Sequence, residues 1–113
     1  ATCAPAHCVP CFSPSLSKRK TRWSRVSVGE DVPQIKNHTA TLDGDRLYIF
    51  GGYDGKRNHN ELHLLNVTTF EWSRPRTQGK TPDGRNGHTA TLVGRRVFVL
   101  GGWLGSGPLA AQD

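Results

Sequence analysis

"HTATLDGDRLYIFGGYDG" occupies residues 38–55, and fifty positions later "HTATLVGRRVFVLGGWLG" occupies residues 88–105. The two stretches share a His-Thr-Ala-Thr-Leu start, a run of apolar residues and a Gly-Gly pair in the same register. A shorter match, Trp-Ser-Arg at residues 23–25 and again at 72–74, has nearly the same spacing. A fixed period near fifty residues indicates a repeat architecture in which each period forms one structural unit.

Within one period the residue types predict short strands joined by tight turns. The segment "HTATL" is small and β-branched, and Asp43-Gly44 after it is a two-residue hairpin signal. The runs "RLYIF" and "RVFVL" are almost continuously apolar, which is typical of strands covered on both faces. Residues 61–67 and 70–76 predict a third and a fourth strand. Four antiparallel strands in such a period describe one blade of a β-propeller, so the fold class is all-β.

The repetition also predicts structural positions. Histidines at matching places suggest a ring nitrogen bonded to local backbone, and paired glycines permit a close approach of another backbone. The two repeated tryptophans are large enough to fill the gap between adjacent blades. The positions expected to be structural are His38, His88, Gly51, Gly52, Gly101, Gly102, Trp23 and Trp72.

A buried strand ending in Gly-Gly, a following segment ending in Trp72, and Arg85-Asn86-Gly87-His88 together resemble the kelch repeat. The resemblance covers residues 22–113 and implies a partial kelch propeller, since closed rings have roughly five to seven blades. We therefore expect a fragment with under two blades; closure of a ring by several copies is the alternative. The expected divisions are a disordered leader at 1–21, the last strand of a preceding blade with its linker at 22–36, a complete repeat at 37–87 and the first half of another at 88–113.

Charge and cysteines concentrate near the start of the chain. The net charge is +6, and the basic run 18–25 is expected to be a solvated tail, with contact to nucleic acid or another anion as the weaker alternative. Cys3, Cys8 and Cys11 could form a zinc site with His7 or a disulfide, but an unstructured leader is the favoured interpretation. The repeats themselves lack cysteine, which favours a reducing, cytoplasmic setting, and no apolar run of about 18 residues predicts a membrane span.

The sequence predicts no catalytic residue, metal or cofactor. The stretch 43–54 begins like a calcium loop but has Tyr48 where that loop requires glycine. His59 and His63 have no evident carboxylate partner at metal-ligand spacing. An enzyme remains the alternative function only if its catalytic residues lie in other blades.

The resemblance instead implies a non-catalytic module, a scaffold or adaptor that binds a protein partner through its loops. Loops held by a rigid scaffold are where binding residues concentrate. The loops in question are 53–60 and 103–112, together with the connection 77–86. The residues expected to contact a partner are Tyr53, Asp54, Lys56, Arg57, Arg85 and Trp103.

Overall fold

The structure is a computed structural model that describes residues 8–13, 21–29 and 32–105. Every regular element in these ranges is a strand, which confirms the all-β class. None of the described residues belongs to a helix that could cross a membrane. The strands are β1 (Cys8–Ser13), β2 (Arg22–Ser27), β3 (Thr39–Asp43), β4 (Arg46–Phe50), β5 (Leu62–Asn66), β6 (Trp72–Ser73), β7 (Thr89–Val93) and β8 (Arg96–Leu100).

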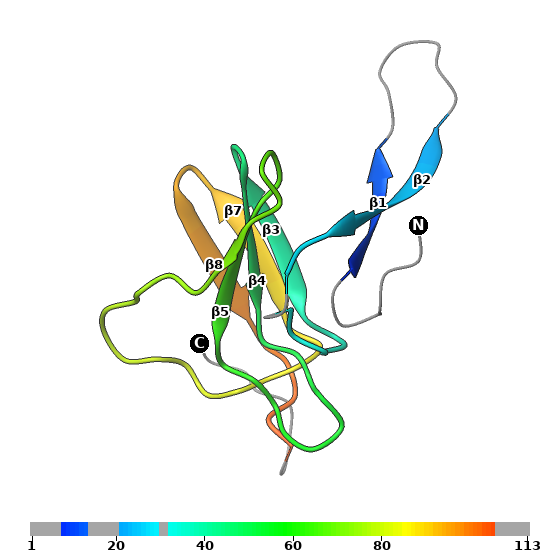
Figure 1. Ribbon diagram of the computed structural model, residues 1–113. Coiled ribbons are helices and arrows are strands. Elements are labelled where there is room, and N and C mark those ends of the chain that lie inside the picture. The colour runs from blue at the N-terminus through cyan, green and yellow to red at the C-terminus, as the bar shows by residue number, and fades with distance from the viewer. Residues whose placement is uncertain (1–7, 14–20, 30–31, 106–113) are drawn as a thin grey trace.

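Strands β3 to β6 form one four-stranded antiparallel sheet in chain order, which is the arrangement expected of a kelch blade. Strands β7 and β8 form a hairpin that lies against this sheet along β3, as Figure 1 shows. The register of β7 and β8 repeats that of β3 and β4, with Thr89 opposite Leu100 as Thr39 is opposite Phe50. The hairpin therefore begins a second blade on the pattern of the first.

The leader differs from the expectation at Cys8–Ser13, which forms β1 and pairs with β2. Pairing with a neighbouring strand gives this segment backbone partners that an unstructured leader would lack. The side chains of Cys8 and Cys11 are not described, and Cys3 lies outside the described residues, as do most of the basic run and the end of the predicted loop 103–112.

The hairpin turns sit one residue later than predicted. Asp43 pairs with Arg46, so the central residues are Gly44 and Asp45 rather than Asp43 and Gly44. Of these two only Gly44 has a positive φ, 62°, which fits a II′ turn with glycine at its first central position. Gly94 repeats this geometry with a φ of 63°, and this explains why the glycine recurs while Asp43 is replaced by Val93.

The fourth strand is shorter than the predicted 70–76. Strand β6 holds only Trp72 and Ser73, paired with Leu65 and Leu64 of β5. Phe70 has a φ of 60°, which is incompatible with an extended strand, and Pro75 lacks the N–H that a longer ladder would use. The strand is limited at both ends by backbone conformation.

The core lies on one face of the blade. Val28, Ile49 and Leu65 are buried together, and Trp72 packs against them. Its counterpart Trp23 is 71% exposed and lies outside this cluster, so a place between blades stays a prediction for both tryptophans. Strand β8 is also less covered than expected, because Phe98 and Leu100 are about half exposed, at 48% and 60%.

His88 joins the two blades. Its side chain is 6% exposed, its Nε2 lies 2.8 Å from Thr39 Oγ1, and its ring meets the Phe50 ring edge-on at 5.5 Å. The sequence predicted a structural histidine bonded to local backbone; the ring contacts both a hydroxyl, that of Thr39, and the Phe50 backbone, and both lie in the preceding repeat. His38, its counterpart, is exposed.

Gly51 is what lets His88 approach. Its φ is 72°, and a Cβ added there would stand 2.5 Å from His88 Cε1 and 2.8 Å from the Arg85 carbonyl oxygen. Even alanine would therefore collide with the residue that joins the blades. The predicted role of this glycine, a close approach of another part of the chain, agrees with this geometry.

Gly51→Ala and Gly94→Ala together separate backbone strain from contact between blades. Both glycines have a positive φ, so alanine strains either one by roughly 1–2 kcal/mol, but nothing lies within 4 Å of the added Cβ at Gly94. We expect the free energy of unfolding to fall by about 1–2 kcal/mol for Gly94→Ala and by about 3 kcal/mol or more for Gly51→Ala. Urea denaturation measures both, and equal losses would contradict this account of Gly51.

The stability of the fold should decrease in mild acid. Burial lowers the pKa of His88, and the Arg85 guanidinium lowers it further. A histidine in the unfolded chain binds a proton near pH 6.5, so below that pH the unfolded state gains protons that folded His88 refuses. Stability is therefore complete above about pH 7 and is lost as pH falls toward 5. Denaturation at several pH values should show a shallower slope for His88→Gln, and His63, whose pKa burial also lowers, contributes to the slope that remains.

Candidate binding groove at the loop end of the blades

The loops that follow the Gly-Gly pairs lie at the same end of the stack, below β4 and β8 in Figure 1. Each places one aromatic residue by main-chain bonds. Tyr53 exchanges two backbone hydrogen bonds with Lys36, at 3.0 and 2.8 Å, and Trp103 exchanges two with Asn86, at 3.1 and 2.7 Å. Because these bonds are made by backbone atoms, the two aromatic positions are equivalent although their side chains differ.

Between these loops is a groove of about 700 Å³. We call it the loop-end groove and define it by its lining side chains, which are basic, aromatic or amide in character. They are Lys36, Lys56 and Arg57; Tyr53 and Trp103; and Asn37, Asn58 and Asn86, with Gly84, Leu104 and Gly105 completing the wall. None of the described residues that line it is acidic.

Three lining residues of the groove form a chain of amide side chains. Asn37 Nδ2 donates to Asn86 Oδ1 at 3.3 Å, and Asn86 Nδ2 donates to Asn58 Oδ1 at 2.6 Å. Asn37 has a φ of 59°, a left-handed conformation that asparagine tolerates better than most residues, and Gly87 takes the same conformation one repeat later. The Gly87 N–H donates to the Asn37 carbonyl at 2.9 Å, so the two repeats meet at this point.

The cations of the groove are exposed and partly oriented. Lys36 Nζ lies 5.8 Å above the centre of the Tyr53 ring, within range of a cation–π contact. Arg57 is 60% exposed, and its Nη2 lies 3.0 Å from Glu61 Oε1. Lys56 is also exposed. Three positive groups therefore line a single hollow that two aromatic side chains also line.

Arg85 is not available to a partner, although the sequence suggested that it is. Its side chain is 0% exposed, Nη1 donates to the Gly101 carbonyl at 2.9 Å, and Nε donates to the Asp83 carbonyl at 3.2 Å. The equivalent residue fifty positions earlier is Ile35, which packs against the core. Position 85 is therefore in the interior, and the Arg85 guanidinium holds the start of the loop after β8 through its hydrogen bond to the Gly101 carbonyl.

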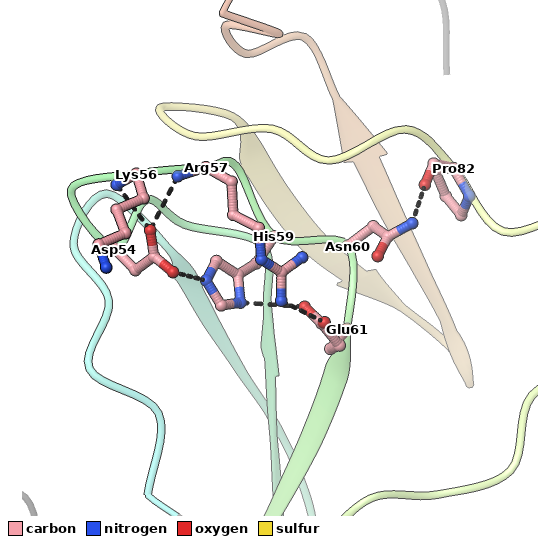
Figure 2. A network of polar contacts seen from close by, with 7 residues as sticks. All are labelled: Asp54, Lys56, Arg57, His59, Asn60, Glu61 and Pro82. Atoms are coloured by element: carbon pink, nitrogen blue, oxygen red, sulfur yellow. Dashed lines mark hydrogen bonds and ion pairs between the residues drawn. The ribbon is translucent and has the colours of Figure 1, made fainter.

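The loop from Asp54 to Glu61 is held by a network of side chains, drawn in Figure 2. Asp54 Oδ1 accepts from the backbone N–H groups of Lys56 and Arg57, each at 2.8 Å. His59 lies between two carboxylates, with Nε2 2.8 Å from Asp54 Oδ2 and Nδ1 3.0 Å from Glu61 Oε2. Asp54 was expected to contact a partner, but its carboxylate is used inside its own loop.

The charges in this network are set by its geometry. The Arg57 N–H lowers the pKa of Asp54 most, followed by the His59 side chain and the Lys56 N–H. Burial alone would raise the pKa of Glu61, but the Arg57 guanidinium and the other contacts outweigh it and lower that pKa. Both carboxyl groups are therefore ionised at neutral pH.

Sequence reasoning found part of this site. The groove brings together four of the predicted residues, Tyr53, Lys56, Arg57 and Trp103. Sequence reasoning missed Lys36, Asn37 and Asn86, which repeat comparison could have found because they precede the repeated histidines, and it missed Asn58. It also missed that Asp54 and Glu61 both contact His59, for which the Asp-x4-His-x-Glu spacing within one loop was the available signal. Within the described part of the chain, no group of three metal-ligating side chains is placed to hold an ion.

A four-stranded antiparallel blade followed by a matching hairpin defines a repeat protein of the β-propeller class. The family is shown by comparison: the profile described as "KLHDC2/KLHL20/DRC7 Kelch-repeats domain" matches residues 12–112. The chain belongs to the kelch-repeat family.

Individual relatives resemble parts of the chain. Acyl-CoA-binding domain-containing protein 4 of Arabidopsis thaliana is 37% identical over 67 residues, 58% of this chain and 10% of that protein. Rab9 effector protein with kelch motifs of Bos taurus is 36% identical over 72 residues, 58% of this chain and 19% of that protein. Kelch domain-containing protein 2 of Bos taurus is 32% identical over 65 residues, 57% of this chain and 16% of that protein. The chain thus spans a small part of each relative's length.

Two arginines test the distinction between interior and groove positions. Arg85→Met removes the donor of the part-buried Gly101 carbonyl from an interior position, so we expect a loss of about 1–3 kcal/mol in the free energy of unfolding. Arg57→Met removes an exposed ion pair and should cost at most about 1 kcal/mol. Thermal or urea denaturation of the two variants compares them directly, and similar losses would show that Arg85 has no special interior role.

Proposed function

We propose that this kelch chain is a non-catalytic interaction module that binds an acidic, extended segment of a protein partner in the loop-end groove. The observation that carries the proposal is the convergence of Lys36, Lys56 and Arg57 on one hollow that has aromatic walls and a row of amides. Lysine and arginine donate charge-assisted hydrogen bonds to carboxylates, and arginine can do so through two parallel bonds.

Aromatic side chains add contacts that do not depend on charge to such a groove. Tyrosine, tryptophan and arginine are enriched among the residues that contribute most to protein interfaces. Tyr53 and Trp103 are placed by backbone bonds before any partner arrives, so little conformational freedom is lost in positioning their Cα atoms. The amide row adds neutral donors and acceptors that suit the main chain of an extended peptide.

The name of one relative supports binding. This relative is called Rab9 effector protein with kelch motifs. No observation among the described residues favours the alternative of a propeller enzyme. We also propose a cytoplasmic location, since the repeats contain no cysteine and need no oxidising compartment.

Charge reversal in the groove tests the function. We expect Lys56→Glu to weaken binding of a fluorescein-labelled oligoglutamate peptide about five- to tenfold, and Trp103→Ala to weaken it about tenfold. Binding should also weaken as salt rises, because exposed charges are screened. Fluorescence anisotropy with the full 113-residue chain measures these effects.

Lys80→Glu is the matched control, because Lys80 is an exposed lysine that lies outside the groove. It changes the net charge by the same amount as Lys56→Glu, so general electrostatic attraction predicts equal effects for the two variants. An equal loss of affinity for both, or binding of an oligolysine peptide of the same length as tight as that of oligoglutamate, would refute the groove as the binding site.

A further inference from the structure

The first and last hairpins of the described chain have the strand pairing of the two halves of a complete blade. Strands β7 and β8 repeat the register of β3 and β4. Strands β1 and β2 repeat that of β5 and β6, because Trp23 lies opposite Phe12 as Trp72 lies opposite Leu65. The last hairpin thus corresponds to the first two strands of a blade, and the first hairpin corresponds to the third and fourth.

The outer edge of β8 is the place where the two halves can join. In the complete blade β4 pairs with β3 on one edge and with β5 on the other, whereas β8 pairs, among the described residues, with β7 alone. Within the same part of the chain β1 pairs with β2 alone. An open strand edge presents a row of N–H and C=O groups that can pair with another strand.

Burial along β8 differs from burial along β4 as two missing strands predict. Ile49 of β4 is 6% exposed, whereas Val99, at the same place in β8, is only partly buried and Val97 is 39% exposed. Ile49 is covered in a cluster that includes Leu65 of β5 and Trp72 of β6. The described strands next to β8 supply no equivalent of these two residues.

A hollow of about 660 Å³ lies where these two side chains would be. Its lining includes Val97 and Val99 of β8 and, from the connection after β6, Pro75, Thr77 and Thr81. In the first blade the residues at the same five repeat positions belong to the core or pack against it. They are Leu47, Ile49, Val26, Val28 and Val32. The hollow is therefore the second blade's version of the first blade's core.

Trp23 is the side chain that matches this hollow. It has the same place in its hairpin as Trp72, and it is 71% exposed. A tryptophan buries roughly 150–250 Å² when it packs in an interface. Within one copy the complete blade lies between the hairpin β1–β2 and the hairpin β7–β8, as Figure 1 shows. A second copy of the chain can therefore supply Trp23 where the same copy does not.

We propose that β8 of one copy pairs antiparallel with β1 of a second copy, and that Trp23 of the second copy enters the hollow beside Val97 and Val99. The register of β4 with β5 then places Phe12 of the second copy opposite Val97. Such a contact joins two different surfaces, and it generates a closed ring when the rotation between copies closes. Each copy adds the equivalent of about two blades, so roughly two to four copies give the four to eight blades of a propeller. The proposal does not depend on the loop-end groove.

Pro10 limits how much the new strand pairing contributes. It corresponds to His63 of β5, and a proline has no N–H to donate. The ladder between copies therefore has one hydrogen bond fewer than the ladder between β4 and β5. Burial of Trp23 must supply a large part of the association, which makes this side chain the place to test it.

The molar mass of the full 113-residue chain tests the assembly. Size-exclusion chromatography with light scattering should give a fixed multiple of the chain mass. Trp23→Ala should weaken the association about tenfold or more and give a monomer at concentrations where the wild type is assembled. Because Trp23 is largely exposed in a single copy, circular dichroism of this variant should still show β structure.

Trp103→Ala is the matched control. Trp103 is also partly exposed, at 42%, but it does not line the hollow, so the mass of this variant should equal that of the wild type. A wild-type monomer, or particles without a fixed mass, would overturn the proposal. An equal loss of association for the two tryptophan variants would also overturn it, because the hollow would then have no particular part in the contact.

A disulfide tests the register between copies. Leu64 lies opposite Tyr48 in the complete blade, so Cys11 of the second copy should lie opposite position 98. Opposed cysteines at strand-pair distance can form a disulfide. Mild oxidation of Phe98→Cys should therefore give a covalent dimer, with residues 11 and 98 joined in the peptide mass spectrum. The dimer should be absent when Cys11→Ser is added. Assembly without this link, or a dimer that persists without Cys11, would overturn the proposed pairing.

Discussion

The insertion of His88 over Gly51 is the contact on which the rest of the described structure depends. It places an aromatic ring from the second repeat against Phe50 and Thr39 of the first, at a spot where no Cβ is present to prevent it. Propeller blades bury their apolar faces against neighbours, so a fixed contact between blades determines how the sheets stack. The segment just before His88 is fixed at the same time, because the Gly52 N–H donates to the Arg85 carbonyl at 2.8 Å.

The groove follows from that stacking. Once the segment before His88 lies against the end of β4, Asn86 is brought within hydrogen-bond distance of both Asn37 and Asn58. The stacking therefore places the loops after the two Gly-Gly pairs at the same end of the sheets. Residues from three parts of the chain meet there as a result of the contacts between the blades. The paired strands provide the rigid support for these loops.

Protonation weakens the fold through two histidines of this chain. His88 and His63 sit in places that lower their pKa, so acid weakens the fold. His59 has different surroundings, with its ring nitrogens 2.8 Å from Asp54 Oδ2 and 3.0 Å from Glu61 Oε2. The environment of each ring, rather than the residue type, therefore decides which part of the structure it supports.

The sequence was informative where the repeat recurs and uninformative where a single residue departs from it. Identical Gly-Gly pairs and apolar runs predicted the strands, because local pattern is enough for hairpins. Burial of Arg85 was not predictable from its type, since a charged residue is expected at the surface unless its partners are known. The shift of the turn to Gly44-Asp45 depended on a backbone angle, and the exposure of Trp23 depended on which neighbours surround it. Such features are decided by tertiary contacts that a pattern of residue types does not contain.

The backbone bridges at Tyr53 and Trp103 allow the binding specificity at the loop end of the blades to change without a change of backbone. Both aromatic positions are defined by pairs of main-chain hydrogen bonds, to residues as different as Lys36 and Asn86. Side chains on either side of each bridge can therefore be exchanged without moving the Cα positions that present them. Single substitutions at these positions can therefore change binding specificity during evolution while the backbone stays the same. For protein engineering, the four bridged positions can be varied together in a mutant library on an unchanged backbone.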